Sequence, residues 1–162
     1  MNNCEIEKKF LVLDDGYKLL SSSVSHISQG YLCSKKVTAR IRKYADKAFL
    51  TIKGKSRDGG LSRFEWEREI PVRCAEKLLK RCSNLIDKHR YIIPYEGFIF
   101  EVDEFHDKNE GLVLAEVELN SKEDNPSLPG WIGEDVTKFA CFRNSYLAKH
   151  PVSTWIKKDG RK

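Results

Sequence analysis

The sequence predicts an antiparallel α+β or barrel protein, with about eight strands and two or three helices. The first observation is a period-two alternation of polar and apolar residues in eight separate segments, as expected for half-buried strands. The second is the shortage of helical patterns, since only two segments are amphipathic at helical spacing. The third is that short turns join most of the strands, which favours antiparallel pairing. The 162 residues suffice for one domain.

The eight strand segments are rich in β-favouring residues. They are Cys4–Phe10, Ile27–Cys33, Thr38–Tyr44, Phe49–Lys55, Phe64–Ile70, Asp87–Ile93, Ile99–Phe105 and Leu112–Leu119. The helices are expected at Cys74–Cys82 and at Thr137–Lys149, with Thr137 as the N-cap. Turn-forming residues predict loops at Leu13–Gly16, Ser56–Gly60 and Ser121–Gly130. Residues 1–150 are expected to form the single domain, and residues 151–162 a basic tail.

Composition narrows the class of partner. The net charge of +5 suits a polyanionic ligand, but basic residues alternate with acidic ones, so we expect no nucleic-acid footprint. No apolar run approaches the ~18 residues of a membrane span, and no export signal is visible, so no membrane partner is expected. The five cysteines lack a Cys-x-x-Cys motif, which predicts free thiols in the cytoplasm rather than a zinc site. An oligomer is possible, but nothing in the sequence indicates one.

Pairs of like charges two residues apart are the unusual feature of the predicted strands. Each pair lies on one face of its strand, and the pairs are sorted by sign: Glu5/Glu7, Arg40/Arg42, Glu65/Glu67, Lys88/Arg90, Glu101/Asp103 and Glu116/Glu118. A single Glu-x-Glu strand is usually a solvated face. In a set, acidic pairs bind Mg²⁺ or Mn²⁺ through oxygen, while Arg and Lys bind phosphate oxygens. The pattern therefore indicates a metal–polyphosphate ligand. If the sheet closes with these faces inward, they line a charged tunnel, and the apolar faces then need cover from helices and loops.

The order of the motifs resembles that of a known superfamily. The chain carries Glu5-Ile6-Glu7-Lys8-Lys9-Phe10, and then, in order, Gln29-Gly30-Tyr31-Leu32, Arg40-x-Arg42, Thr51-x-Lys53, Phe64-Glu65-Trp66-Glu67, Lys88-x-Arg90-Tyr91, Phe100-Glu101-x-Asp103, Ala115-Glu116-Val117-Glu118-Leu119 and Gly133-Glu134-Asp135-Val136-Thr137. This set resembles the CYTH domain, or triphosphate tunnel metalloenzyme, superfamily. It is most similar to the short, single-domain bacterial branch, which hydrolyses inorganic triphosphate to pyrophosphate and phosphate. The resemblance implies the fold of that family, α+β and mainly antiparallel β, with an eight-stranded closed β-barrel that encloses a charged tunnel and a few flanking helices.

The resemblance implies a role for each charged residue of these motifs. The implied ligands of two Mg²⁺ or Mn²⁺ ions are Glu5, Glu7, Asp103, Glu116 and Glu118. The implied catalytic and triphosphate-binding cations are Lys9, Arg40, Arg42, Lys53, Lys88 and Arg90, with Glu65 and Arg143 completing the substrate site. Roles for Glu67 and Glu101 are left open. Relatives often have a basic residue where this chain has Cys141, and Arg143 is the substitute that this sequence offers.

Two other functions stay open at this stage. A class IV-type adenylyl cyclase or a thiamine or nucleoside triphosphatase would use the same fold, although the His-Phe pair typical of the cyclase branch is missing ahead of Glu5. A non-catalytic polyphosphate- or nucleotide-binding module would keep tight binding without turnover. The intact glutamate pairs favour an enzyme.

Overall fold

The computed structural model describes residues 4–33, 38–57 and 62–155, with side chains described for residues 6–32, 39–54 and 64–155. The strands are β1 (Cys4–Val12), β2 (Ser23–Cys33), β3 (Thr38–Tyr44), β4 (Lys47–Arg57), β5 (Ser62–Glu69), β6 (Leu85–Tyr95), β7 (Phe98–Phe105), β8 (Val113–Leu119) and β9 (Ile132–Asp135). The helices are α1 (Tyr17–Leu20), α2 (Val72–Leu79) and α3 (Asn144–Leu147), with short 3₁₀ turns η2 (Asp107–Asn109), η3 (Ala140–Phe142) and η4 (Val152–Thr154).

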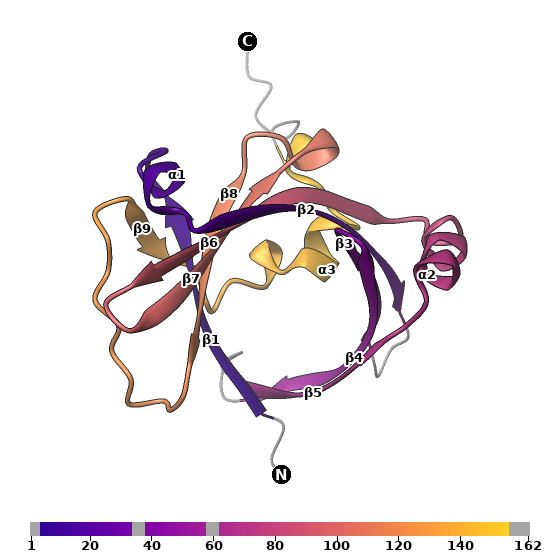
Figure 1. Cartoon of the computed structure of the whole chain (residues 1–162), viewed down its shortest axis with the longest axis horizontal. Helices are drawn as coiled ribbons and strands as arrows, with labels where there is room; N and C mark the ends of the chain where they lie inside the picture. The colour runs from indigo at the N-terminus through magenta and orange to yellow at the C-terminus, as the bar shows by residue number, and fades with distance from the viewer. Residues whose placement is uncertain (1–3, 34–37, 58–61, 156–162) are drawn as a thin grey trace.

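The strands form one antiparallel sheet that curves into a ring. Its order is β5-β4-β3-β2-β6-β7-β8-β1-β9, and β1 also pairs with β5. This extra pairing joins the two ends of the eight-stranded series through three residue pairs, from Cys4↔Phe64 to Ile6↔Ser62. Figure 1 looks into the ring, with β1 and β5 meeting near the N-terminus. The predicted α+β, mainly antiparallel barrel is confirmed.

Strand β9 is an element that the sequence patterns did not reveal. It pairs with the C-terminal part of β1, at Phe10↔Asp135 and Val12↔Ile132, on the edge whose N-terminal part pairs with β5. Four residues are too few to show a period. A second unpredicted element is α1, a single turn between β1 and β2. Neither changes the order of the eight barrel strands.

The prediction of a long C-terminal helix at Thr137–Lys149 is wrong. The structure has the 3₁₀ turn η3 and the one-turn helix α3 instead. Thr137 caps no helix, because its hydroxyl oxygen accepts a hydrogen bond from the Lys9 backbone N–H at 2.9 Å. The apolar stripe is real, but it packs as two short turns. The helix predicted at Cys74–Cys82 begins and ends earlier, as α2.

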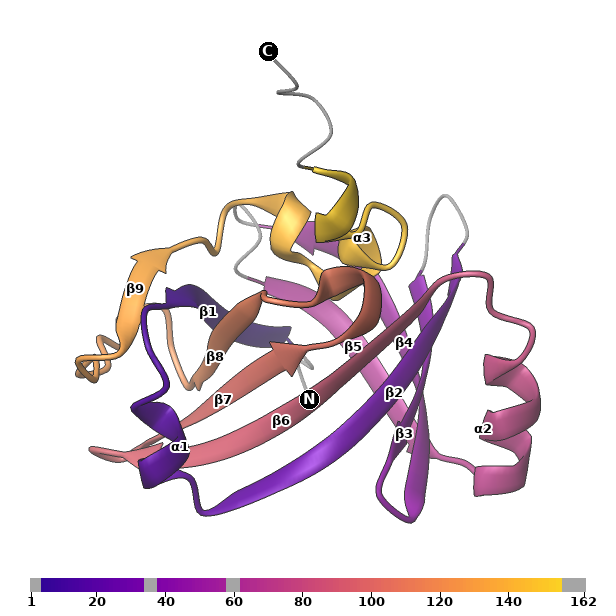
Figure 2. The same ribbon diagram turned by 90° about the horizontal axis from the view of Figure 1, so that it is seen from above.

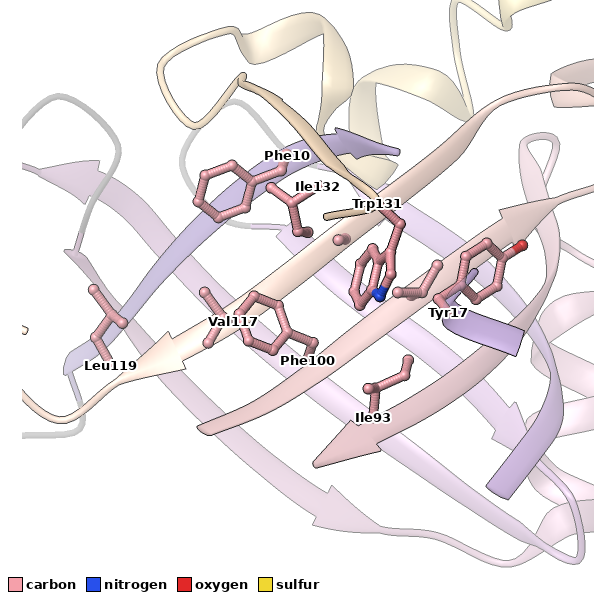
Figure 3. Packing of buried hydrophobic residues seen from close by; sticks show 10 residues of the cluster. Phe10, Tyr17, Ile93, Phe100, Val117, Leu119, Trp131 and Ile132 are labelled. Atoms are coloured by element: carbon pink, nitrogen blue, oxygen red, sulfur yellow. The ribbon is translucent and has the colours of Figure 1, made fainter. Parts of the chain in front are cut away.

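The outward apolar faces of β1, β3, β4 and β6–β8 are covered, as the sequence predicts, whereas Phe64 and Trp66 on β5 are exposed. On β1 and β6–β8 a buried cluster includes Phe10 and Phe100, and Trp131 and Tyr17 cover it from the β8–β9 connection and α1. Trp131 meets the rings of Tyr17 and Phe100 edge-on, at centroid distances of 5.9 Å each (Figure 3). Helix α2 covers β3 and β4, with Ala75 buried against Ile41. These two hydrophobic clusters therefore lie outside the ring.

The C-terminal segment closes one end of the ring. Leu147 of α3 is fully buried in a cluster with Ile86, Phe105 and Leu114 from three barrel strands. Figure 2 shows α3 at one end of the barrel, above β8. Residues 151–155, which the sequence assigns to the tail, also pack here, since Trp155 contacts the Phe142 ring. No helix in the described part of the chain is long and apolar enough to span a bilayer.

The predicted loops and free thiols are confirmed in part. The loops at Leu13–Gly16 and Ser121–Gly130 are confirmed, whereas β4 runs on through Arg57 into the loop predicted at Ser56–Gly60, the rest of which lies outside the described residues. Free thiols are confirmed for Cys74, Cys82 and Cys141. The side chains of the remaining two cysteines lie outside the described part.

Candidate functional site

The charged residues of seven strands share the inner face of the ring. Directly paired residues lie on the same face of a sheet, and the register links Lys9↔Glu116 and Glu116↔Glu101 around β1, β8 and β7. The same face continues through Arg90↔Asp103 and, beyond β2, through Arg40↔Thr51. We call this set the interior charged cluster: Lys9, Arg40, Arg42, Lys53, Glu65, Glu67, Lys88, Arg90, Glu101, Asp103 and Glu116.

Contacts between strands that are not neighbours confirm that this face is concave. Arg40 on β3 donates to Glu67 on β5 at 3.3 Å, across β4. Arg90 on β6 donates to Glu116 on β8 at 3.1 Å, across β7. Side chains reach over an intervening strand in this way only on the inside of a curved sheet. The cluster therefore points into the barrel.

One half of the cluster lies on β3, β4 and β5. Arg42 donates from one guanidinium nitrogen to both Glu67 oxygens, at 3.1 and 3.3 Å. The Thr51 hydroxyl donates to Glu67 at 2.6 Å and accepts from Arg40 at 3.2 Å. Lys53 lies 2.5 Å from Glu65. Glu67 thus fixes two arginines, which leaves their remaining N–H groups available for phosphate oxygens.

The other half lies on β1, β6, β7 and β8. Asp103 is almost fully buried and accepts from Lys88 and, through both carboxylate oxygens, from Arg90 at 2.7 Å each. Arg90 also pairs with Glu101. Lys9 lies 2.6 Å from Glu116. Buried charges persist when they are paired in this manner.

The electrostatics tie the two halves together. Burial raises the pKa of Glu116, but Lys9, Arg90 and Lys88 outweigh it and hold that pKa well below its usual range. Burial, with Arg90 nearby, lowers the pKa of Lys88 to about 8 despite Asp103. Burial and Arg40 lower the pKa of Arg42, which also feels Arg90 and Glu101 from the opposite half. Glu116 is therefore a carboxylate at neutral pH, as a cation ligand must be.

The inner face changes from charged to apolar at the end that α3 closes. On each of three strands an apolar residue lies two positions from a charged one and therefore on the same inner face. The pairs are Lys9 and Leu11 on β1, Asp103 and Phe105 on β7, and Glu116 and Leu114 on β8. Ile86 holds the same place beside Lys88 on β6. Leu147 packs on this apolar end. The charged part of the interior is thus sealed by hydrocarbon on one side.

Carboxylates face one another in the arrangement that a cation would stabilise. Glu7 on β1 is the direct cross-strand partner of Glu118 on β8. Glu116 is opposite Glu101 on β7, and Arg90 pairs with both of these carboxylates. Like charges directly opposite each other destabilise a sheet unless a positive charge lies between them. Among the described residues no three such groups are already gathered at metal-binding distance. The all-oxygen donor set nevertheless fits Mg²⁺ or Mn²⁺.

Most of the residues predicted for the site come together in this cluster. The sequence assigned charged residues to the site or left their roles open, and eleven of them lie in the interior charged cluster. Glu7 and Glu118 lie on the same face of β1 and β8. The side chain of Glu5 lies outside the described part, although its backbone pairs with β5. Arg143 precedes α3, and no ion pair in the described part joins it to the cluster. Glu67 and Glu101, left open before, are full members.

Two neutral residues on the same inner face as the interior charged cluster were missed as site residues. Thr51 is fully buried between Arg40 and Glu67, and Gln29 is fully buried and donates to the Tyr31 hydroxyl at 2.9 Å. Both belong to motifs and have the inward parity of their strands. Their inward parity could have identified them as site residues, but the charge pairs that indicated the site include no amide or hydroxyl side chain.

Comparison with known proteins agrees with this geometry. Residues 3–148 match the CYTH domain. An inorganic triphosphatase of Acetivibrio thermocellus is 46% identical over 154 residues, which cover 93% of this chain and 97% of that protein. An inorganic triphosphatase of Nitrosomonas europaea is 35% identical over 153 residues, covering 89% and 96% of the two chains.

Solved structures show the same fold. The crystal structure of an inorganic triphosphatase superposes with a TM-score of 0.64 at 31% identity, covering 89% of this chain and 93% of that one. A Hippeastrum protein studied as an adenylyl cyclase, whose dominant activity is that of a triphosphatase, shares the fold at a TM-score of 0.60 and 17% identity, over 72% and 80% of the two chains. With its motifs in order on the inner face of the barrel, the chain belongs to the CYTH domain family.

Proposed function

We propose that this protein hydrolyses inorganic triphosphate to pyrophosphate and phosphate within the barrel, with Mg²⁺ or Mn²⁺ as cofactor. The observation that carries the proposal is the interior charged cluster, in which arginines, lysines and carboxylates line one concave face. Two relatives at 46% and 35% identity are inorganic triphosphatases, which supports the same substrate here. A linear polyanion with several phosphates matches a surface that presents cations along its length.

The cations would bind and orient the phosphate chain. Arg40 and Arg42 are held by Glu67, so their guanidinium groups are pre-oriented. Lys9, Lys53, Lys88 and Arg90 lie on the same inner face. As water attacks the terminal phosphorus and its bond to the bridging oxygen breaks, negative charge grows on the departing pyrophosphate. Fixed cations stabilise that charge without reorganising.

The carboxylates would hold the cofactor. Glu7, Glu116 and Glu118, with Glu5 and Asp103, form the proposed ligand set for two ions. The bound ions supply charge neutralisation of the phosphates and a more acidic water. Glu116 now pairs with Lys9 and Arg90, so these two side chains also keep it ionised before an ion binds. Arg143, two residues after Cys141, is proposed to contact the substrate from the closed end.

The deciding experiment is a parallel assay of phosphate release. Inorganic triphosphate, ATP and thiamine triphosphate are each supplied with Mg²⁺ and with Mn²⁺, and the ATP products are separated by chromatography. We expect metal-dependent release that is fastest on inorganic triphosphate. Cyclic AMP without release would identify a cyclase. Binding of triphosphate in calorimetry with no release from any substrate would identify a non-catalytic module.

A further inference from the structure

Three of the four histidines of the chain gather on the outer face of the barrel, away from the interior charged cluster. His26 on β2 is the direct cross-strand partner of His89 on β6. His106 follows β7, and its backbone N–H donates to the Asp87 carbonyl on β6 at 3.0 Å. Lys88 and Arg90 point inward, so their neighbours Asp87 and His89 point outward. The three imidazoles therefore form one surface group across three adjacent elements.

The rings lie at the spacing of imidazoles that share one ion. The centroids of His26 and His89 are 5.2 Å apart, and those of His89 and His106 are 4.8 Å apart. Nitrogen ligands at ~2.0–2.1 Å in tetrahedral geometry would place ring centroids about 5 Å apart. The Nδ1 atom of His89 and the Nε2 atom of His106 already face each other at 2.6 Å.

A carboxylate holds the His26 ring by its second nitrogen. Asp87 lies 2.8 Å from Nε2 of His26, and it also accepts from the Ser28 hydroxyl at 3.1 Å. Metal-binding histidines typically have their second nitrogen fixed by a carboxylate in this way, which sets the tautomer and the ring orientation. Glu110 lies near Nδ1 of His106, at 3.6 Å, which is beyond hydrogen-bond distance. All three rings are at least partly open to solvent, so an ion can enter.

We propose that His26, His89 and His106 form a second metal site, on the outside of the barrel, for a borderline transition-metal ion such as Zn²⁺. Three imidazoles favour Zn²⁺, Ni²⁺ or Cu²⁺ over Mg²⁺ and Mn²⁺, which prefer oxygen. Among the described residues the donors are not yet at coordination distance. Binding replaces the hydrogen bond between His89 and His106, moves its proton to the far nitrogen of one ring, and widens that N···N distance from 2.6 Å to about 3.3 Å.

The test is Zn²⁺ binding to tag-free protein, measured by calorimetry in excess Mg²⁺, which competes for the interior carboxylates. We expect one Zn²⁺ per chain and an affinity reduced at least about 10-fold in His89→Gln and in His106→Gln. His150→Gln is the matched control, because His150 stacks on Tyr146 outside this group and its loss should leave the affinity unchanged. Co²⁺ absorption provides a second readout, with a tetrahedral spectrum that the two variants lose.

Glu116→Gln separates the outer site from the interior. Zinc binding that survives Glu116→Gln and is lost in His89→Gln supports the proposal. Binding lost in Glu116→Gln and kept in His89→Gln places zinc in the barrel and overturns it, as does the absence of stoichiometric binding by the wild type. Circular dichroism checks that each variant is folded. His106→Gln, beyond the end of β7, keeps the test valid if His89→Gln does not fold.

Discussion

The Nζ atom of Lys9 lies 2.6 Å from Oε1 of Glu116, and the two side chains are only 8% and 14% exposed. Arg90 donates to the other oxygen of this carboxylate at 3.1 Å. Without a bound ion, two basic residues therefore neutralise a glutamate that the proposal assigns to the cofactor. An ion held by Glu116 would take the place of Lys9 and Arg90 at this carboxylate and leave these cations to bind phosphate. Under the proposed function, the pairing would thus link cofactor binding with substrate binding.

Replacing Glu116 with Gln should abolish most turnover. The amide keeps the shape of the side chain but removes the charge that attracts the ion. Loss of a group that only hydrogen-bonds to a metal ligand typically lowers metal affinity about 10- to 100-fold, so we expect loss of a ligand to lower it by at least as much. Steady-state phosphate release against Mg²⁺ concentration measures it. Glu134→Gln, on the exposed part of β9, is the matched control and should behave as the wild type. Near-normal turnover of Glu116→Gln would contradict the assignment.

Replacing Arg42 with Ala should lower kcat/KM for triphosphate by about 10- to 100-fold. That range corresponds to about 1.5–3 kcal/mol for a hydrogen bond to a charged group. Arg68→Ala removes an arginine from the outward face of β5, the strand beyond β4, and serves as control. Steady-state kinetics give kcat/KM for both variants, and equal values for the two would rule out a substrate contact by Arg42.

The stabilising effect of Glu67 should depend on pH. Burial raises the pKa of Glu67, but the Thr51 hydrogen bond, Arg42 and Arg40 together lower it below the ordinary 4.5. A carboxyl with a depressed pKa in the folded state stabilises above its unfolded pKa and loses this contribution as pH falls through the folded one. Urea unfolding should therefore show a larger deficit for Glu67→Gln near pH ~7 than near pH ~3. A deficit that is constant with pH would show that the charge of Glu67 contributes nothing.

Substituting Gly30 with Ala should destabilise the barrel. A Cβ at this position of β2 would lie 2.7 Å from Sγ and 2.8 Å from Cβ of Cys82. Overpacking of this kind costs about 1–3 kcal/mol. The double variant Gly30→Ala/Cys82→Ala removes the contact with the sulfur and keeps the contact with the Cβ of residue 82. Chemical denaturation should therefore show a smaller loss in the free energy of unfolding for the double variant than the sum of the losses for the two single variants. Strict additivity would mean that the sheet moves away instead.

Alternation along single strands was enough to predict the antiparallel strands and their charged faces, and the family resemblance implied that they close into a barrel. On β7, Glu101 and Asp103 lie on one side of the sheet, and Phe100 and Val102, which alternate with them, lie on the other, because consecutive strand residues point to opposite faces. Short-range patterns failed at the C-terminus, where the stripe through Phe142 and Leu147 suggested one helix. Two short turns form there because those residues pack into the end of the barrel, and packing overrides propensity.

The sequence by itself determined which residues face inward and which charges they carry, since both follow from strand parity and residue type. Only the tertiary structure decided the partners. That Lys9 meets Glu116, that Glu67 rather than a neighbour holds Arg42, and that His89 meets His106 depend on strand register and ring curvature. Both are set by pairings between residues far apart in the chain, and no local pattern encodes them.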